Sequence, residues 1–353
     1  MSKLLEIEDL RVSFATEDGV VKAVDGVSLS VDSGGMLGVV GESGSGKSVS
    51  MLTVMGLTRA ENTSFSGRAT FEGRDLLTAT GEELRRIRGN DIAMIFQDPL
   101  SSLHPFFKVG KQLVEAMQAH NDVSSKAALD RAVELLGLVG IPDPRARVNA
   151  YPHEFTGGMR QRAMIAMALT NEPKLLIADE PTTALDVTVQ AQILQLIARL
   201  RRELNMAVVL ITHDLGVVAE VTERIAVMYA GRIVEEAETS RIFRAPEHPY
   251  TWGLLQSIPR LDRPRNEKLI PIPGRPPSLI SPPSGCSFHP RCPYVRDRHR
   301  KVDPMLEPTP DDPSHGVACL LPSETRKQIW RELHAGMEPE AAKAAVQFEE
   351  RPA

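Results

Sequence analysis

The chain has 353 residues, of which 42% are hydrophobic and 25% charged, and its net charge at pH 7 is −5. This length can bury a large core in one or two domains, and the acidic balance argues against non-specific nucleic-acid binding, which needs a basic face. The N-terminus shows no apolar signal segment, and the longest apolar runs fall short of the roughly 18 residues that cross a bilayer. We therefore expect a cytoplasmic protein that reaches a membrane only through partners.

A phosphate-binding loop follows the apolar strand predicted at residues 36–40. It reads Gly41-Glu42-Ser43-Gly44-Ser45-Gly46-Lys47-Ser48. This is the G-x-x-x-x-G-K-[ST] pattern, and the apolar segment from Val49 onward gives it the required strand–loop–helix setting. The glycines let backbone N–H groups turn toward the β- and γ-phosphates of a nucleotide. Lys47 would add positive charge there, and the Ser48 hydroxyl would ligate Mg²⁺. Val49, directly after the loop, is included in the predicted nucleotide-binding segment.

The next part of the chain predicts a helical insertion in an α/β core. Strand signals vanish between residues 97 and 158, and the segment 126–141 places apolar residues at helical spacing. Elsewhere, apolar strands alternate with helical patterns, which predicts a largely parallel sheet covered by helices. We expect these strands to flank residues 36–48, 92–96, 175–179, 208–212 and 224–229. The helical insertion is expected at about residues 98–160.

Polar residues follow two of the predicted strands and supply further candidate catalytic groups. The strand at 175–178 ends in Asp179 and Glu180, and another buried strand ends at His213. Asp179 would hold Mg²⁺ through water, and Glu180 would polarise the attacking water as a general base. An acidic strand end alone is common, but beside a phosphate loop it indicates a nucleoside triphosphatase.

These motifs, in this order, resemble the ATP-binding subunits of ABC transporters over nearly the whole chain. The resemblance implies a RecA-like parallel-sheet core with an inserted helical subdomain. In that family the serine–glycine–glycine signature of one subunit caps the ATP held by the other subunit's phosphate loop. Here F-T-G-G-M stands in place of L-S-G-G-Q, and Thr156 keeps the hydroxyl. The resemblance therefore assigns this contact to Thr156, Gly157 and Gly158.

Other positions take their roles from the same resemblance. Phe14 matches the aromatic residue that stacks on adenine, and Gln97 matches the glutamine that senses Mg²⁺ and the attacking water and links to the membrane subunits. Asp186 ends the D-loop at residues 184–186, which crosses the dimer interface. His213 matches the switch histidine that contacts the γ-phosphate. Taken alone, Phe14 and His213 would more often be ordinary interior residues.

The segments 246–253 and 271–294 resemble the peptide-importer branch, and within it the D-type subunit. The resemblance implies an ATPase on the cytoplasmic face of the inner membrane that powers peptide import. Its expected partners are an F-type ATP-binding subunit, two transmembrane permease subunits and, through them, an extracytoplasmic solute-binding protein. Nickel or another solute as cargo, a soluble ABC ATPase of repair or translation, and an iron-responsive regulator stay as alternatives. The expected units are 1–255 for the nucleotide-binding domain, 256–325 for an irregular Cys- and Pro-rich extension and 326–353 for a helical or frayed tail.

All three cysteines of the chain lie after residue 285. In the peptide-importer branch, four cysteines with this spacing are associated with a [4Fe–4S] cluster. The third of those positions is a histidine here, and an imidazole with three thiolates also suits Zn²⁺. The resemblance thus predicts a cluster, or zinc, on Cys286, Cys292, His299 and Cys319. His289 and His315 are rival fourth ligands, and a tail that has lost its metal is the remaining alternative.

Overall fold

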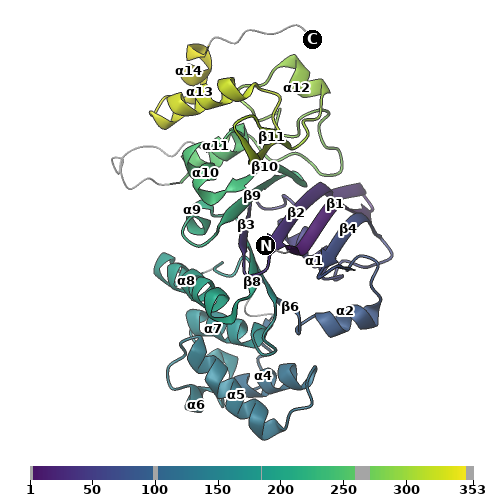
Figure 1. Ribbon diagram of the computed structural model, residues 1–353, viewed down its shortest axis with the longest axis vertical. Coiled ribbons are helices and arrows are strands. Elements are labelled where there is room, and N and C mark those ends of the chain that lie inside the picture. Colours follow the sequence, from purple (N-terminus) through teal and green to yellow (C-terminus); the bar gives the residue numbers. More distant parts are fainter. Residues whose placement is uncertain (1–2, 98–101, 184, 259–270, 347–353) are drawn as a thin grey trace.

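The computed structural model describes residues 3–97, 102–183, 185–258 and 271–346. Its N-terminal part is a four-stranded antiparallel sheet in the order β2-β1-β4-β5 (Figure 1). Buried apolar residues alternate with exposed polar ones along much of the long strands, as in a sheet with one solvated face. The sequence analysis did not predict these strands. They are β1 Lys3–Thr16, β2 Gly19–Asp32, β4 Thr63–Phe71 and β5 Arg74–Asp75.

The second sheet has eight strands in the order β11-β12-β10-β9-β3-β8-β7-β6. Its centre is parallel from β9 to β6, and every residue of β3, β7 and β8 is buried, as expected for strands covered on both faces. The predicted parallel core is thereby confirmed. These five strands are β3 Met36–Val40, β6 Ile92–Ile95, β7 Leu175–Asp179, β8 Ala207–Thr212 and β9 Arg224–Tyr229.

Helices form a lobe at one end of the long axis, as predicted for the insertion (Figure 1). Their apolar faces share one hydrophobic core with the parallel sheet. Ser124 and Thr156 cap two of these helices by accepting backbone N–H groups, which satisfies donors left free at a helix start. The lobe holds α4 Val109–Gln118, α5 Ser125–Leu138, α6 Pro144–Arg147, the 3₁₀ turn η1 Pro152–Glu154 and α7 Gly157–Ala168.

The remaining helices flank the two sheets and build the C-terminal end. Within the described ranges, no helix combines the length and apolarity needed to cross a membrane. The helices are α1 Lys47–Val54, α2 Gly81–Ile87, α8 Val187–Leu204, α9 Leu215–Val218, α10 Thr239–Arg244, α11 Pro249–Gln256, α12 Asp297–Lys301, α13 Ser323–His334 and α14 Pro339–Ala345.

The C-terminal extension is part of the folded core. Its strand β12 Asp312–Val317 pairs with β10 Arg232–Glu238, and β11 Glu307–Thr309 pairs with β12. Helices α13 and α14 bury Trp330 and Ala342 in a small cluster with Trp252 of α11. The extension is therefore more regular than its composition predicts. Residues 347–353 of the expected frayed tail lie outside the described part of the chain.

Buried charges join the extension to the core. The fully buried Glu235 carboxylate accepts the backbone N–H groups of Glu247 and His248 at 2.6 and 3.1 Å. Nε2 of His315 lies 2.7 Å from the same carboxylate. The buried Glu247 carboxylate in turn accepts Nε–H of Arg326 at 2.9 Å. Such groups are tolerated inside a protein because each carboxylate is paired or hydrogen-bonded.

The buried His248 imidazole predicts a loss of stability in mild acid. Burial lowers the pKa of His248 to about 4, from an ordinary value of 6.5. The unfolded chain therefore binds a proton that the folded chain excludes, and the free energy of unfolding falls as the pH falls from the unfolded value toward the folded one. We expect this residue to remove about 3 kcal/mol over that interval.

His248→Asn tests this expectation. Nδ1 of His248 caps α11 by accepting N–H of Tyr250 at 3.1 Å, and an Asn oxygen can accept the same bond without titrating. Urea unfolding across the interval should show a shallower pH dependence for His248→Asn than for the native chain. Equal dependences would contradict the assignment.

Candidate nucleotide-binding and catalytic site

The parallel register places three functional segments at one edge of the sheet. Val40 of β3 lies opposite Thr212 of β8, and Asp179 of β7 lies opposite Ile211. The phosphate loop after β3, Glu180 after β7 and His213 after β8 therefore leave the sheet side by side. In parallel α/β sheets this carboxyl edge is where ligands bind.

The phosphate loop is packed too closely for side chains at two of its glycines. A Cβ at Gly41, whose φ is +153°, would lie 2.1 Å from the carbonyl oxygen of Met228. A Cβ at Gly46, whose φ is +100°, would lie 2.4 Å from the carbonyl oxygen of Ala23. Both glycines are required because the loop is clamped between β9 and β2.

The Lys47 side chain folds back over this loop. Its Nζ donates to the carbonyl oxygens of Gly41 and Glu42 at 2.7 and 2.9 Å. Burial lowers the pKa of Lys47, while the nearby carboxylates of Glu180 and Asp179 act in the opposite direction. The loop thus holds a buried ammonium group. The oxygens of a bound phosphate could accept its hydrogen bonds in place of the two carbonyl oxygens.

Ser48 and Asp179 meet beside the lysine. The Ser48 hydroxyl donates to Oδ1 of Asp179 at 2.9 Å, and Asp179 is only 5% exposed. Burial raises the pKa of the Asp179 carboxyl group, and the bond from Ser48 lowers it. A hydroxyl and a carboxylate are the oxygen ligands that Mg²⁺ takes together with nucleotide phosphates, so the two residues fit the ion that the sequence predicts.

The Glu180 carboxylate is held by three polar side chains. Oε2 accepts Nε2–H of Gln97 at 2.8 Å and the Thr183 hydroxyl at 3.0 Å. Oε1 lies 3.4 Å from Nδ1 of His213. Glu180 also has a φ of +46°, which is uncommon for a residue with a side chain. The structure therefore brings together Glu180, Gln97 and His213, and it adds Thr183, which the sequence analysis missed.

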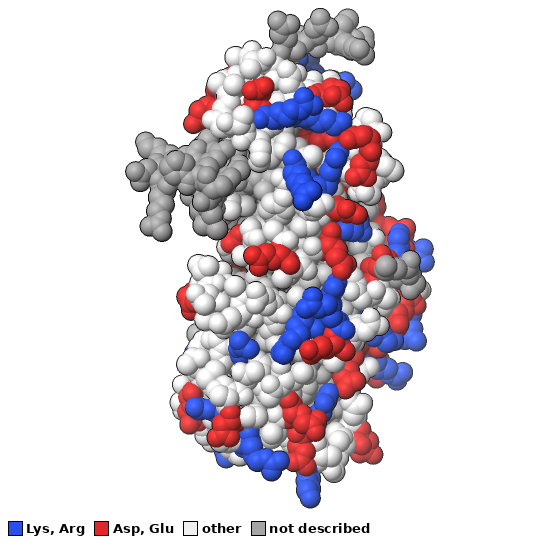
Figure 2. Space-filling model, turned by 60° about the vertical axis from the view of Figure 1, so that its left-hand side comes forward, with Lys and Arg blue, Asp and Glu red and all other residues white. Residues whose placement is uncertain are grey.

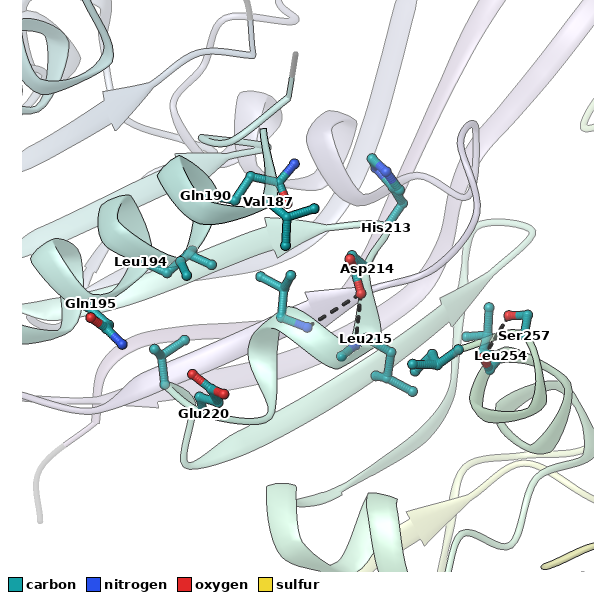
Figure 3. Close-up of a pocket in the computed structure, with 15 residues that line it drawn as sticks. Val187, Gln190, Leu194, Gln195, His213, Asp214, Leu215, Glu220, Leu254 and Ser257 are labelled. Atoms are coloured by element: carbon teal, nitrogen blue, oxygen red, sulfur yellow. Dashed lines mark hydrogen bonds between the residues drawn. The ribbon is translucent and has the colours of Figure 1, made fainter. Parts of the chain in front are cut away.

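A cleft of about 490 Å³ opens beside His213, between α8, α9 and α11. Figure 3 shows His213 at its rim and Asp214 turned back to cap α9, where Oδ1 accepts N–H of Gly216 at 2.9 Å. The described lining of this cleft contains none of the phosphate-loop residues, so the cleft adjoins the catalytic group without including the phosphate site.

The signature segment lies away from the phosphate loop of the same chain. Thr156 and Gly157 are exposed, and the Thr156 hydroxyl accepts N–H of Met159 at the start of α7. The nearest neighbour of a Cβ on Gly157 or Gly158 would be Leu185 or Val189, at the start of α8. Among the described residues, no hydrogen bond or ion pair joins this segment to the phosphate loop.

Three further predicted residues occupy structural positions. Asp186 caps α8 by accepting N–H of Val189 at 3.0 Å, while Ala184 of the same predicted loop lies outside the described residues. Phe14 is half-buried on β1 opposite Val21, in the hairpin that borders the phosphate loop. Val49 packs into the core between the N-terminal sheet and α1. The adenine contact of Phe14 stays a prediction.

The predicted metal ligands do not form a site. His299 is 5% exposed, and its Nδ1 accepts N–H of Arg296 within its own helical turn. The rivals are also engaged, since Nδ1 of His289 lies 3.0 Å from the carbonyl oxygen of Cys286 and His315 contacts Glu235. Across the ranges that the structure describes, no group of three or more Cys, His, Asp or Glu side chains could hold a metal ion. The cysteines of the predicted set, Cys286, Cys292 and Cys319, are free thiols.

Sequence reasoning also missed the residues that hold Glu42. The Arg291 guanidinium donates to both carboxylate oxygens of Glu42, at 2.8 and 3.1 Å. The backbone N–H of Glu42 donates to the Tyr250 hydroxyl at 2.9 Å. A carboxylate inside a phosphate-binding loop was the available signal, because such a charge calls for a nearby cation.

The sequence of this chain is similar to known families and proteins. A family model described as "ABC transporter" matches residues 24–183, and one described as "Oligopeptide/dipeptide transporter, C-terminal region" matches residues 234–298. The oligopeptide transport ATP-binding protein OppD of Bacillus subtilis is 53% identical over 309 residues, which are 87% of this chain and 85% of that protein. OppD of Escherichia coli is 50% identical over 91% of this chain and 94% of its own length. The dipeptide transport ATP-binding protein DppD of Bacillus subtilis is 53% identical over 91% of this chain and 95% of its own length.

Solved structures agree with these sequence matches. The ATP-binding cassette MJ0796, in a dimeric structure bound to ADP and Pi, gives a TM-score of 0.60 at 26% identity and covers 67% of this chain and 98% of that chain. CbiO1 of Clostridium perfringens, part of an ABC transporter complex, gives a TM-score of 0.59 at 25% identity and covers 69% of this chain and 92% of that chain. The chain therefore belongs to the ATP-binding proteins of the ABC transporter family, in the oligopeptide and dipeptide importer branch.

Proposed function

We propose that this chain is the ATP-hydrolysing subunit that powers import of oligopeptides or dipeptides across the cytoplasmic membrane. One observation carries the proposal: Lys47, Ser48, Asp179 and Glu180 lie at the carboxyl edge of one parallel sheet, where Ser48 donates to Asp179 and where Gln97 and His213 contact Glu180. The sequence is 53% identical to proteins named for oligopeptide and dipeptide transport, and this similarity supports peptides as the cargo class.

In this proposal each residue has one task. The Lys47 ammonium exchanges its two carbonyl partners for phosphate oxygens, and Ser48 and Asp179 hold Mg²⁺, which would neutralise charge on the phosphates. Glu180 accepts a proton from the attacking water. Gln97 and His213 hold that carboxylate in place.

We propose that this chain pairs with an F-type ATP-binding subunit at the cytoplasmic face of the inner membrane. The pair binds two transmembrane permease subunits, which receive cargo from an extracytoplasmic solute-binding protein. The exposed signature segment supports this arrangement, because Thr156 lacks a described contact with its own phosphate loop. On the face that Figure 2 draws, positive and negative side chains are interspersed, as on a surface without a nucleic-acid footprint. The units 1–255, with the helical insertion at 98–160, 256–325 and 326–353 remain proposed boundaries.

Glu180→Gln tests the general base. Gln keeps the size of the side chain but cannot take a proton, so the ATP turnover of the assembled transporter should fall at least about 100-fold at this site. Binding of ADP should persist, because no described hydrogen bond or ion pair joins the Glu180 side chain to the phosphate loop. Glu203→Gln, the same change on the exposed face of α8, is the control. Near-native turnover in Glu180→Gln would rule out the role.

Thr156→Asp tests whether the signature acts on the partner's nucleotide. Asp caps a helix as well as Thr does, so α7 should remain intact, but its charge would oppose a γ-phosphate. Turnover of the assembled complex should drop at least about tenfold, with Thr156→Ser as the conservative control. ADP affinity of the isolated chain should not change. Weakened ADP binding by the isolated variant would place Thr156 in its own chain's site instead.

The [4Fe–4S] cluster, and Zn²⁺ as its alternative, are left out of the proposed function because the described residues contain no group of three or more Cys, His, Asp or Glu side chains that could hold a metal ion. We expect anaerobically purified chain to carry no stoichiometric metal on the four predicted residues. Iron, sulfide and zinc analysis checks this, and about four irons per chain would contradict it.

A further inference from the structure

The Cys-rich extension reaches the phosphate loop through one arginine. Arg291 lies between Phe288 and Cys292, 249 residues after Glu42, and its guanidinium donates to both oxygens of the Glu42 carboxylate. Its Nε also donates to the carbonyl oxygen of Pro273 at 2.9 Å. The Arg291 side chain is 5% exposed and that of Glu42 is 27% exposed. A two-bond, largely desolvated pair of this kind fixes orientation as well as charge.

Aromatic residues fix the arginine and the first turn of the loop together. The Arg291 guanidinium lies 5.8 Å from the ring centre of Tyr229, which is in contact with the rings of Tyr250 and Phe288. The Tyr250 hydroxyl accepts N–H of Glu42. The backbone and the carboxylate of Glu42 are thus both held by residues outside the phosphate loop.

Glu42 is an unusual neighbour for a triphosphate. Its carbonyl oxygen accepts from Lys47, and its carboxylate acts electrostatically on the same ammonium group. A free carboxylate at this point would repel nucleotide phosphates and compete for the positive charge of Lys47. The Arg291 guanidinium balances that charge.

We infer that Arg291 is a positioning residue of the nucleotide site: it neutralises and orients the Glu42 carboxylate, so that nucleotide affinity depends on the C-terminal extension. The inference rests on the proposed role of the phosphate loop in ATP binding. Through this contact, a displacement of the extension would weaken ATP binding without any change in the loop sequence.

The test measures Mg·ADP affinity of the full chain by titration calorimetry. Arg291→Met keeps much of the side-chain bulk but removes the charge, and it should raise the Kd for ADP about tenfold. The double variant Glu42→Gln/Arg291→Met removes both charges and should return the Kd to within about threefold of the native value. This rescue separates a counter-charge from a purely structural contact.

Two further variants keep the test interpretable. Arg326→Met removes another buried arginine from the C-terminal part of the chain, which is paired with Glu247 and remote from the phosphate loop. This variant should be less stable than the native chain, while its Kd for ADP should stay within about twofold of the native value. Arg291→Lys keeps the charge and should bind ADP within about threefold of the native chain, and it replaces Arg291→Met if the latter fails to fold.

Native ADP affinity in Arg291→Met, or an equal loss with and without Glu42→Gln, would overturn the inference. If Arg291→Met does not fold, a tenfold loss in Arg291→Lys would overturn it. Failure of the native chain itself to bind ADP would instead count against the proposed function, so the two failures are distinct.

Discussion

The parallel register of β3, β8 and β7 is the constraint on which the rest of the site depends. It brings the phosphate loop, Glu180 and His213 to one edge, although the phosphate loop precedes the other two by more than 100 residues. Close packing then fixes the details, since the carbonyl oxygens of Met228 and Ala23 leave room only for glycine at Gly41 and Gly46. The chemistry follows from this packing, which assembles a buried ammonium group, a hydroxyl–carboxylate pair and a carboxylate contacted by Gln97, Thr183 and His213.

The C-terminal extension continues this core rather than trailing from it. Strand β12 joins the main sheet through β10, and the buried carboxylates of Glu235 and Glu247 contact His315 and Arg326 from the C-terminal part of the chain. Removing one member of such a pair leaves a buried charge, which is why these contacts hold the extension firmly. The hydrogen bond from Arg291 to Glu42 also joins the extension to the phosphate loop.

Local patterns made the nucleotide site predictable. The phosphate loop and the acidic end of β7 depend on residues adjacent in sequence, and buried parallel strands stand out as apolar runs. The N-terminal sheet was missed although β1 alternates, because its long strands contain polar stretches and bulges that interrupt the period. Thr183, Tyr250 and Arg291 were missed because their partners are set by the tertiary fold. The spacing of His299 suggested a ligand, and this stays a prediction; in the structure its Nδ1 accepts N–H of Arg296 within a helical turn.

We propose that the phosphate loop and catalytic carboxylate of this chain form half of a site that a second subunit completes. A structure of the assembled complex in the Glu180→Gln form with Mg·ATP bound would test this arrangement. We expect a γ-phosphate beside Lys47 of this chain, and Thr156 of this chain beside the γ-phosphate held by the partner subunit. A complex in which Thr156 stays remote from any nucleotide, or in which ATP avoids the phosphate loop, would contradict it.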